Sequence, residues 1–360
     1  MIYYHLEHQE DYNEWDNFIQ NCPKGHYGQL STYLKSFTAY GAKYKIIVAK
    51  KEEKIIGGIG LIIFGKGPFK LTSLPIGPVI ATGHEDIFQD LLYEGLNFSK
   101  QIKAFMFQLQ VPFTGQDKRP YLYESISLPE PSSTLEGFPF TVGSVANQFL
   151  MVDLDIEESE ETWEESMLMS FKAKTRKSIR KVEREDLLHI REATNDSDIK
   201  DAYNLMILNG VEQGYSTRSW EEFGPTLKEQ VQKKQAILLT VFKDDLLMGV
   251  HYGVIAGESY NYVMGGVRRL EKDYLVGHFM QWNAMKKAKS LGLKTYDFTS
   301  TGTPGVFKFK IGFNPQQYIF DKSYYYILSK SKYNLFYKLF PFIKKHKKKL
   351  ASISCIINRS

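Results

Sequence analysis

Few side chains of this 360-residue sequence have the spacing of a known chemical site. The eight histidines form no HxxxH or HxH pair, and no GxSxG or GxxxxGK[ST] string occurs. Zinc enzymes, serine hydrolases and P-loop enzymes hold their ligands or nucleophiles at those spacings, so the sequence predicts no metal site and none of these classes. His251 lies in an apolar, strand-like run, and we interpret it as a core residue. Cys22 and Cys355 lie near opposite ends, which leaves no CxxC motif.

Two charged features could take part in chemistry. Asp297 lies in a short strand-like run, Lys294 to Phe298, where its carboxylate could accept a proton from an amine or orient it. The alternative is a carboxylate that caps a turn or a helix. A run of basic side chains could follow an RNA backbone or lie on a plain solvated helix. The run consists of Lys172, Lys174, Arg176, Lys177, Arg180, Lys181 and Arg184.

The composition is that of an ordinary soluble protein. The net charge of +5 favours an anionic partner without identifying one. The first residues contain neither a basic leader nor an apolar core, and no apolar run reaches the ~18 residues of a spanning helix. Together with the sparse cysteines, this predicts a cytoplasmic protein, attached at most to a membrane surface.

A weak internal repeat predicts how the elements are arranged. In each half a hairpin with a charged turn is followed by a helical pattern and a short apolar run, and Gly57 and Gly249 occupy the same place after the turn. The repeated segments are the hairpins at 46–63 and 236–255, the helices at 85–100 and 274–291, and the strands at 104–109 and 294–298. This order predicts a duplicated α/β unit.

The segment 128–143 is rich in proline, serine and glycine and reads as a linker. We therefore predict a first domain at 1–140, a second at 141–330 and a basic, aromatic tail at 331–360.

Five groups of short strings extend this interpretation. They are Trp15 to Phe18 with Gly25 to Lys35, Arg176 to Lys181, Gly214 to Ser219, Ala288 to Phe298, and Phe309 to Phe313. In this order they resemble the FemAB/FemX group of bacterial acyl- and aminoacyltransferases. The resemblance implies a mixed α/β fold with two tandem GNAT-like domains, each a mixed β-sheet flanked by helices, and a cleft between them. The segment 166–188 is too short for the two-helix arm of some members, so the chain is more similar to the arm-less FemX type.

Members of this group transfer an amino acid from aminoacyl-tRNA to an amine of a peptidoglycan precursor. Such a reaction must hold two anionic substrates and stabilise an oxyanion. The resemblance places Lys310 and Phe309 beside the 3′ end of the donor, and Asp297 could then receive the amine proton. The alternative for Lys310 is a surface lysine on an alternating strand, Val306 to Phe313.

The resemblance also implies substrate contacts. Lys35 and Arg218 match residues that hold the diphosphate of a UDP-linked acceptor, and cations suit phosphate. Gln29 and Tyr215 lie in the same strings and are candidate substrate-binding residues. Lys174, Arg176, Lys177 and Arg180 are candidates for binding tRNA or another anion.

The donor is predicted from a missing feature. An acetyl-CoA site of the GNAT type needs a glycine-rich loop before a helix, whereas Val267 to Tyr274 contains no glycine. We therefore expect aminoacyl-tRNA as donor, no cofactor, a UDP- or lipid-linked peptidoglycan precursor as acceptor, and a monomer. One alternative is an acyl-CoA-dependent N-acyltransferase acting on a surface-polysaccharide or nucleotide-sugar amine. Another is a GNAT-derived binding module without catalysis.

The tail places apolar and aromatic residues ahead of five lysines within 333–350. This pattern suits an anionic membrane surface. A disordered basic end, or one that contacts tRNA, is the alternative. We expect Pro341 to interrupt any single helix here.

Overall fold

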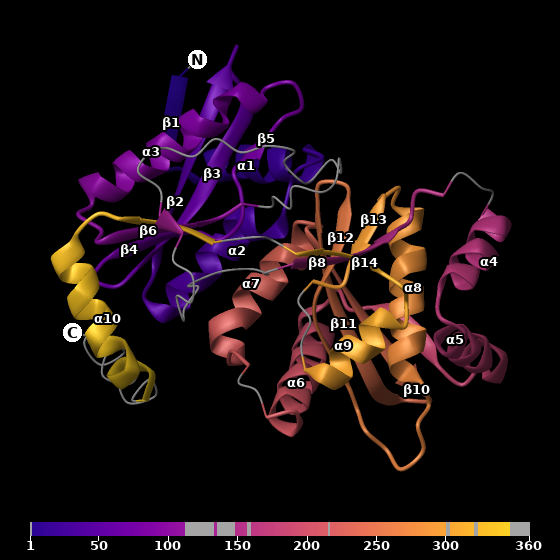
Figure 1. The fold of residues 1–360 in the computed structure, drawn as a ribbon. Coiled ribbons are helices and arrows are strands. Elements are labelled where there is room, and N and C mark those ends of the chain that lie inside the picture. The colour runs from indigo at the N-terminus through magenta and orange to yellow at the C-terminus, as the bar shows by residue number, and fades with distance from the viewer. Residues whose placement is uncertain are drawn as a thin grey trace. The chain divides into compact units, whose positions relative to one another are not determined.

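The computed structural model describes residues 2–111, 133–134, 148–156, 160–214, 217–299, 303–319 and 323–345 (Figure 1). The chain divides into two compact units, one of residues 1–145 and 320–360 and the other of residues 146–319. We expected the second domain to extend to residue 330. Its unit ends at Ile319 because the next strand, β15 (Ser323–Ile327), pairs with β6 (Met106–Gln110) in the first unit.

The first unit contains a mixed sheet with strand order β1-β2-β3-β4-β6-β15-β7, in which β5 also pairs with β3. The β4–β6 pair is parallel and the other pairs are antiparallel. The other strands are β1 (Ile2–Leu6), β2 (Lys43–Lys51), β3 (Lys54–Phe64), β4 (Leu71–Leu74), β5 (Val79–Ile80) and β7 (Ser133–Thr134). The helices are α1 (Gln9–Asn21), α2 (Ser31–Lys35), α3 (Phe88–Gln101) and α10 (Lys330–Lys345), with short 3-10 turns at Tyr27–Gln29, Ser36–Tyr40 and Glu85–Ile87.

The second unit repeats this plan with strand order β9-β10-β11-β12-β13-β8-β14, in which the β12–β13 pair is parallel. Its strands are β8 (Gln148–Asp153), β9 (His189–Glu192), β10 (Ala236–Lys243), β11 (Leu246–Ala256), β12 (Ser259–Val267), β13 (Thr295–Asp297) and β14 (Gln316–Ile319). Its helices are α4 (Glu160–Ser170), α5 (Ala173–Glu185), α6 (Asp196–Glu212), α7 (Trp220–Gln232), α8 (Val276–Ser290) and α9 (Pro304–Ile311). The tandem GNAT-like architecture predicted from the sequence is therefore confirmed.

The repeat extends to the irregularities of the hairpins. Gly57 pairs with Ala49, and Gly249 pairs with Val241; between each of these pairs and the hairpin turn, the register shifts by one residue. A Cβ on Gly57 would lie 2.8 Å from Ile87 Cδ1, just before α3, and one on Gly249 would lie 2.6 Å from a methyl carbon of the first residue of α8. Both glycines therefore make room for the start of the helix that follows.

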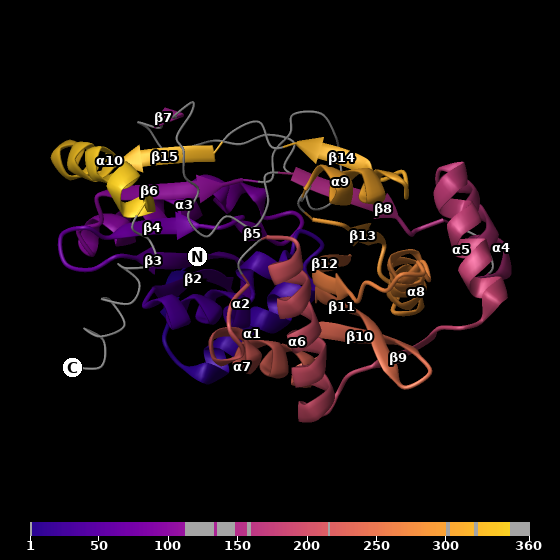
Figure 2. The ribbon, with the colours of Figure 1, turned by 90° about the horizontal axis from the view of Figure 1, so that it is seen from below.

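Helices cover both faces of the second sheet (Figure 2). The missing Cβ of Gly249 faces α8, whereas that of Gly266, in the pair next to it on the same two strands, faces Met206 of α6. The core under α8 contains Trp282, which stacks on Trp163 of α4 at a centroid distance of 5.8 Å. Helices α8 and α6 thus hold the sheet between two apolar layers.

Two local expectations were wrong. Residues 304–311 form helix α9, which begins after the cap Thr303, and do not form an alternating strand. Helix α10 continues through Pro341 to Lys345. A proline removes one helical hydrogen bond but need not end a helix that is supported elsewhere. Within the described residues, no helix has the length and apolarity to cross a membrane.

Candidate active site

The second sheet opens where β13 ends. Strand β13 pairs with β12 over three residues, the last pair being Asp297 with Asn261. Beyond this point β12 continues beside β11 alone, and the chain after β13 leaves the sheet. Thr299 Oγ1 donates a hydrogen bond of 2.8 Å to the carbonyl of Tyr262 across this opening. Because β12 and β13 pair over only three residues before they separate, the end of β13 lies next to the middle of β12.

Asp297 lies at this point and is completely buried. Its Oδ1 accepts hydrogen bonds from the backbone N–H groups of Leu150 (2.9 Å) and Thr299 (2.8 Å), whereas its Oδ2 has no hydrogen-bond partner among the residues that the structure describes. Burial raises the pKa of Asp297 to about 7, although both backbone hydrogen bonds and the charge of Lys310 act to lower it. The carboxyl group can therefore exchange a proton near neutral pH.

Lys310 reaches the same place from α9. Its side chain is only 5% exposed, and its Nζ donates a hydrogen bond of 2.6 Å to the carbonyl of Phe298. The ammonium lies 5.6 Å from the ring centroid of Tyr262. Burial lowers the pKa of Lys310 to about 8, while the charge of Asp297 acts to raise it. The alternative of a surface lysine on a strand is therefore contradicted.

Phe309 is half-buried and packs edge-on against His278 (5.1 Å) and Phe313 (5.4 Å). Its ring lies over the first turn of α8, where a Cβ added to Gly277 would make an ordinary van der Waals contact of 3.4 Å with Phe309. Burial lowers the pKa of His278, and the charge of Lys174 lowers it further, against Asp273, which acts to raise it. The start of the basic helix α5 is thus close enough to act electrostatically on His278, which packs against Phe309.

A buried polar network that includes His251 and Tyr296 packs against the ring of Tyr262. The ring of His251 stacks on Tyr262 at 4.5 Å, and its Nε2 lies 2.7 Å from the hydroxyl of Tyr296. The Tyr296 hydroxyl donates its proton to Gln281 Oε1, so it must accept the hydrogen bond from His251 Nε2–H. His251 Nδ1 then carries no proton and accepts a hydrogen bond from the Tyr260 hydroxyl, 3.4 Å away. Burial lowers the pKa of His251 to about 3. His251 is a neutral core residue, as the sequence indicated.

The sequence did not single out Tyr262 or Thr299. The available signal was the alternation of Tyr260 and Tyr262 along β12, which places both rings on one face of the strand. Only the folded structure, in which α9 brings Lys310 Nζ to 5.6 Å from the Tyr262 ring, shows that this face meets Lys310.

The first-unit strings have clear structural roles. Trp15 Nε1 donates to the carbonyl of Gln29 (2.7 Å), and Asp16 accepts from the N–H (2.6 Å) and hydroxyl (2.7 Å) of Ser31, the first residue of α2. Gln29 is fully buried, and its amide pairs with both backbone groups of Gly60. Lys35 is exposed at the end of α2. Roles of Gln29 and Lys35 in substrate binding stay predictions.

Arg218 in the second unit is half-buried, with its guanidinium 5.0 Å from the ring centroid of Phe223. The next residue, Ser219, forms a capping box with Glu222 that starts α7. Tyr215 lies outside the described residues. The pairing of Arg218 with Lys35 joins two different units and also stays a prediction.

The four cations of α5 are not equivalent. Lys174 and Lys177 are exposed. Arg176 Nη1 donates to the carbonyls of Met169 (3.1 Å) and Phe171 (3.3 Å) at the end of α4, and Arg180 forms an ion pair with Glu165. The two arginines therefore help to join α5 to α4, and the two lysines are the stronger candidates for an external anion.

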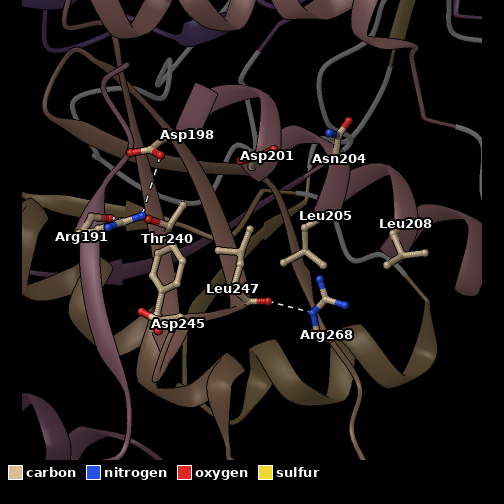
Figure 3. A pocket seen from close by; sticks show the side chains of 11 residues that line it. Arg191, Asp198, Asp201, Asn204, Leu205, Leu208, Thr240, Asp245, Leu247 and Arg268 are labelled. Atoms are coloured by element: carbon tan, nitrogen blue, oxygen red, sulfur yellow. Dashed lines mark hydrogen bonds and ion pairs between the residues drawn. The ribbon is translucent and has the colours of Figure 1, made fainter. Parts of the chain in front are cut away.

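A separate cavity of about 380 Å³ lies between α6 and strands β9 to β11 (Figure 3). Arg268 points into it while its Nε donates to the carbonyl of Leu247 (2.9 Å), and Arg191 lies 3.9 Å from Asp198. The cavity does not include Asp297 or Lys310. Arg268 belongs to the glycine-free stretch before α8. Its side chain lines the cavity on the α6 side of the sheet.

Comparisons with known proteins agree with this architecture. Residues 169–310 match the family described as acetyltransferase (GNAT) domain. A crystal structure of FemX is similar, with a TM-score of 0.75 and 18% identity, covering 93% of this chain and 99% of that one. The C-terminal domain of a putative lysylphosphatidylglycerol synthetase from Agrobacterium fabrum matches with a TM-score of 0.51 and 11% identity, over 93% of this chain and 96% of that one.

The structure of L-PGS from Bacillus licheniformis matches with a TM-score of 0.51 and 10% identity, over 90% of this chain and 93% of that one. At the level of sequence, no curated protein matches. The resemblance to FemX inferred from short strings is thus confirmed as a likeness of fold. This chain has the tandem GNAT-like fold of FemX, and the segment that matches the acetyltransferase (GNAT) domain family includes both Asp297 and Lys310.

Proposed function

We propose that this protein is an aminoacyltransferase that moves an amino acid from aminoacyl-tRNA to an amine of a peptidoglycan precursor. The observation that carries the proposal is the buried pair of Lys310 and Asp297 at the end of β13. Buried ionisable groups with pKa values moved towards neutrality are characteristic of catalytic sites.

The reaction assigns a role to each member of the pair. The amine nitrogen attacks the ester carbonyl, the C–N bond forms and the C–O bond to the tRNA ribose breaks. Asp297 Oδ2 receives the proton from the attacking amine, and that proton then passes to the departing ribose oxygen. The Lys310 ammonium stabilises the oxyanion that forms in between, as oxyanion-hole donors do. Since both side chains are buried, these contacts require the surrounding residues to move when substrate binds.

Charges around the pair support an anionic donor. Lys174 acts on His278, next to Phe309, and Lys177 is exposed on the same helix. Residues 267–274, which precede the N-cap Leu275 of α8, contain no glycine. They therefore lack the glycine-rich loop that a GNAT-type acetyl-CoA site needs. We propose that α5 contacts the tRNA backbone, and that Lys35 and Arg218 hold the diphosphate of a UDP- or lipid-linked acceptor. A cytoplasmic location and a monomeric state belong to the same proposal.

A second candidate is an acyl-CoA-dependent N-acyltransferase acting on a sugar amine. It is favoured by the match of residues 169–310 to the acetyltransferase (GNAT) domain family. A binding module without catalysis is favoured by the burial of Lys310, whose hydrogen bond to Phe298 could serve structure alone.

The test supplies purified protein with a labelled pool of charged tRNA and, separately, with labelled acetyl-CoA, each with peptidoglycan precursors. We expect ribonuclease-sensitive label on the precursor. Label from acetyl-CoA alone would support the second candidate. Label from neither donor, on these precursors and on amino sugars, would contradict both enzymatic readings.

A further inference from the structure

The last described helix, α10, presents an apolar face for which the described structure supplies no covering element. One face of α10 is anchored to the first unit: the ring of Phe336 packs on Phe105 at 5.0 Å, and Tyr333 joins the same cluster. The yellow helix in Figure 1 therefore belongs to the first unit and is more than an extension of the chain.

The face next to this anchored one carries partly exposed leucines. Leu335 is 47% exposed and Leu339 is 44% exposed, and their i, i+4 spacing puts them side by side on the helix. Tyr337, which is 52% exposed, lies on the opposite flank of the helix, where it stacks on Tyr333. Exposed apolar side chains gathered on one helix face mark an interaction surface more often than scattered ones do.

Charge is segregated onto the same segment. Residues 322–360 contain ten lysine and arginine residues and no aspartate or glutamate. Since the whole chain carries +5, residues 1–321 carry −5. The segment that contains α10 is therefore strongly basic on a protein that is otherwise acidic.

We propose that α10 docks the protein on an anionic lipid bilayer, with Leu335 and Leu339 entering the interface and the neighbouring lysines contacting lipid headgroups. A helix with apolar residues on one face and lysines beside them binds such surfaces parallel to the plane of the membrane. RNA would supply the negative charge but no apolar phase for the leucines, and an acidic protein would not explain so long a run of lysines. This proposal does not depend on the enzymatic function proposed above.

The test is sedimentation of the full chain with vesicles of phosphatidylglycerol and phosphatidylcholine in equal parts, compared with pure phosphatidylcholine. We expect binding to the anionic vesicles only, weakened by salt because the lysine contribution is screened. Replacing Lys338, Lys344 and Lys345 by glutamine should weaken binding roughly a hundredfold, at about fivefold per lysine. The matched control replaces three exposed lysines elsewhere, K51Q/K54Q/K200Q, and should bind like the wild type.

The apolar part has its own pair of variants. L335Q/L339Q should weaken vesicle binding about tenfold or more while leaving the unfolding curve unchanged. L208Q/L246Q, which changes leucines that are each 42% exposed in the second unit, should have no effect. Equal binding of L335Q/L339Q and wild type would overturn the proposal. So would binding to bulk tRNA that needs the lysines, with no binding to vesicles.

Discussion

Replacing Lys310 by methionine should separate catalysis from folding. Methionine has a similar length but no charge, and Lys310 is 5% exposed. Its pKa falls from an ordinary 10.5 to about 8, so holding the ammonium in the folded protein costs about 3 kcal/mol below pH 8. Methionine removes this cost but leaves the buried carbonyl of Phe298 without this donor, which costs about 1–3 kcal/mol. We expect Lys310→Met to unfold within about 2 kcal/mol of the wild type at pH 7, while the transfer rate falls about 10²–10³-fold.

The pH dependence gives this prediction a definite sign. Between about pH 8 and 10.5 the folded protein has released the Lys310 proton, whereas the unfolded chain still holds it. Stability rises with pH wherever the unfolded state binds more protons, so the wild type gains stability in this window. Methionine cannot titrate, and the loss of the nearby cation further raises the pKa of Asp297. The stability of the variant relative to the wild type should therefore decrease as the pH rises through this window.

Urea unfolding at several pH values, together with the transfer assay, measures both effects. Lys308→Met is the control, because it removes an exposed lysine of the same helix and should change neither activity nor the pH dependence of stability. The reasoning is refuted if Lys310→Met transfers the acyl group like the wild type. It is also refuted if the variant is destabilised by more than about 4 kcal/mol at pH 7, since Lys310 would then act mainly as a structural clamp.

Three further outcomes follow. The rate should rise with pH through about 7 as Asp297 loses its proton and fall above about 8 as Lys310 does; Asp297→Asn should lower the rate and abolish the acid limb of a pH–rate profile. Trp15→Phe removes a 2.7 Å hydrogen bond to a buried carbonyl and should lower the free energy of unfolding by about 1–3 kcal/mol, measured by urea unfolding; no change would mean that water replaces the bond. Gly249→Ala should lower it by about 1–3 kcal/mol in the same assay, because its Cβ would lie 2.6 Å from α8, whereas Gly305→Ala has open space and should be neutral or slightly stabilising; equal effects would disprove the packing argument.

Sequence patterns predicted the repeated architecture because hairpins and helices have local signatures. The charged turns and the glycines after them placed both hairpins, and the register shift just before each glycine shows how alike the two units are. The end of the second unit was misplaced, because β15 is recognisable as a strand but its partner β6 lies more than two hundred residues earlier. The pattern of residues within one strand does not indicate which distant strand it pairs with.

The candidate site was predicted only in part. Asp297 and Lys310 were named from short strings, yet the secondary structure around Lys310 was misjudged, because its apolar neighbours alternate as they would in a strand. The aromatic support from Tyr262 depends on the pairing of β12 with β13, which the sequence does not reveal. Conversely, Trp15 and Asp16 belong to a string that suggested function and turn out to fix the start of α2.

The return of β15 to the first sheet has a consequence for biosynthesis. Strand β6 is complete once residue 110 has been made, but its antiparallel partner begins at residue 323. At about 5–20 residues per second, a ribosome needs roughly 10 to 40 seconds to reach it. During that interval β6 has one bare edge, while the entire second unit emerges and can fold. The second unit is therefore an insertion into the first, and the sheet of the first unit becomes complete only after the whole second unit has been made.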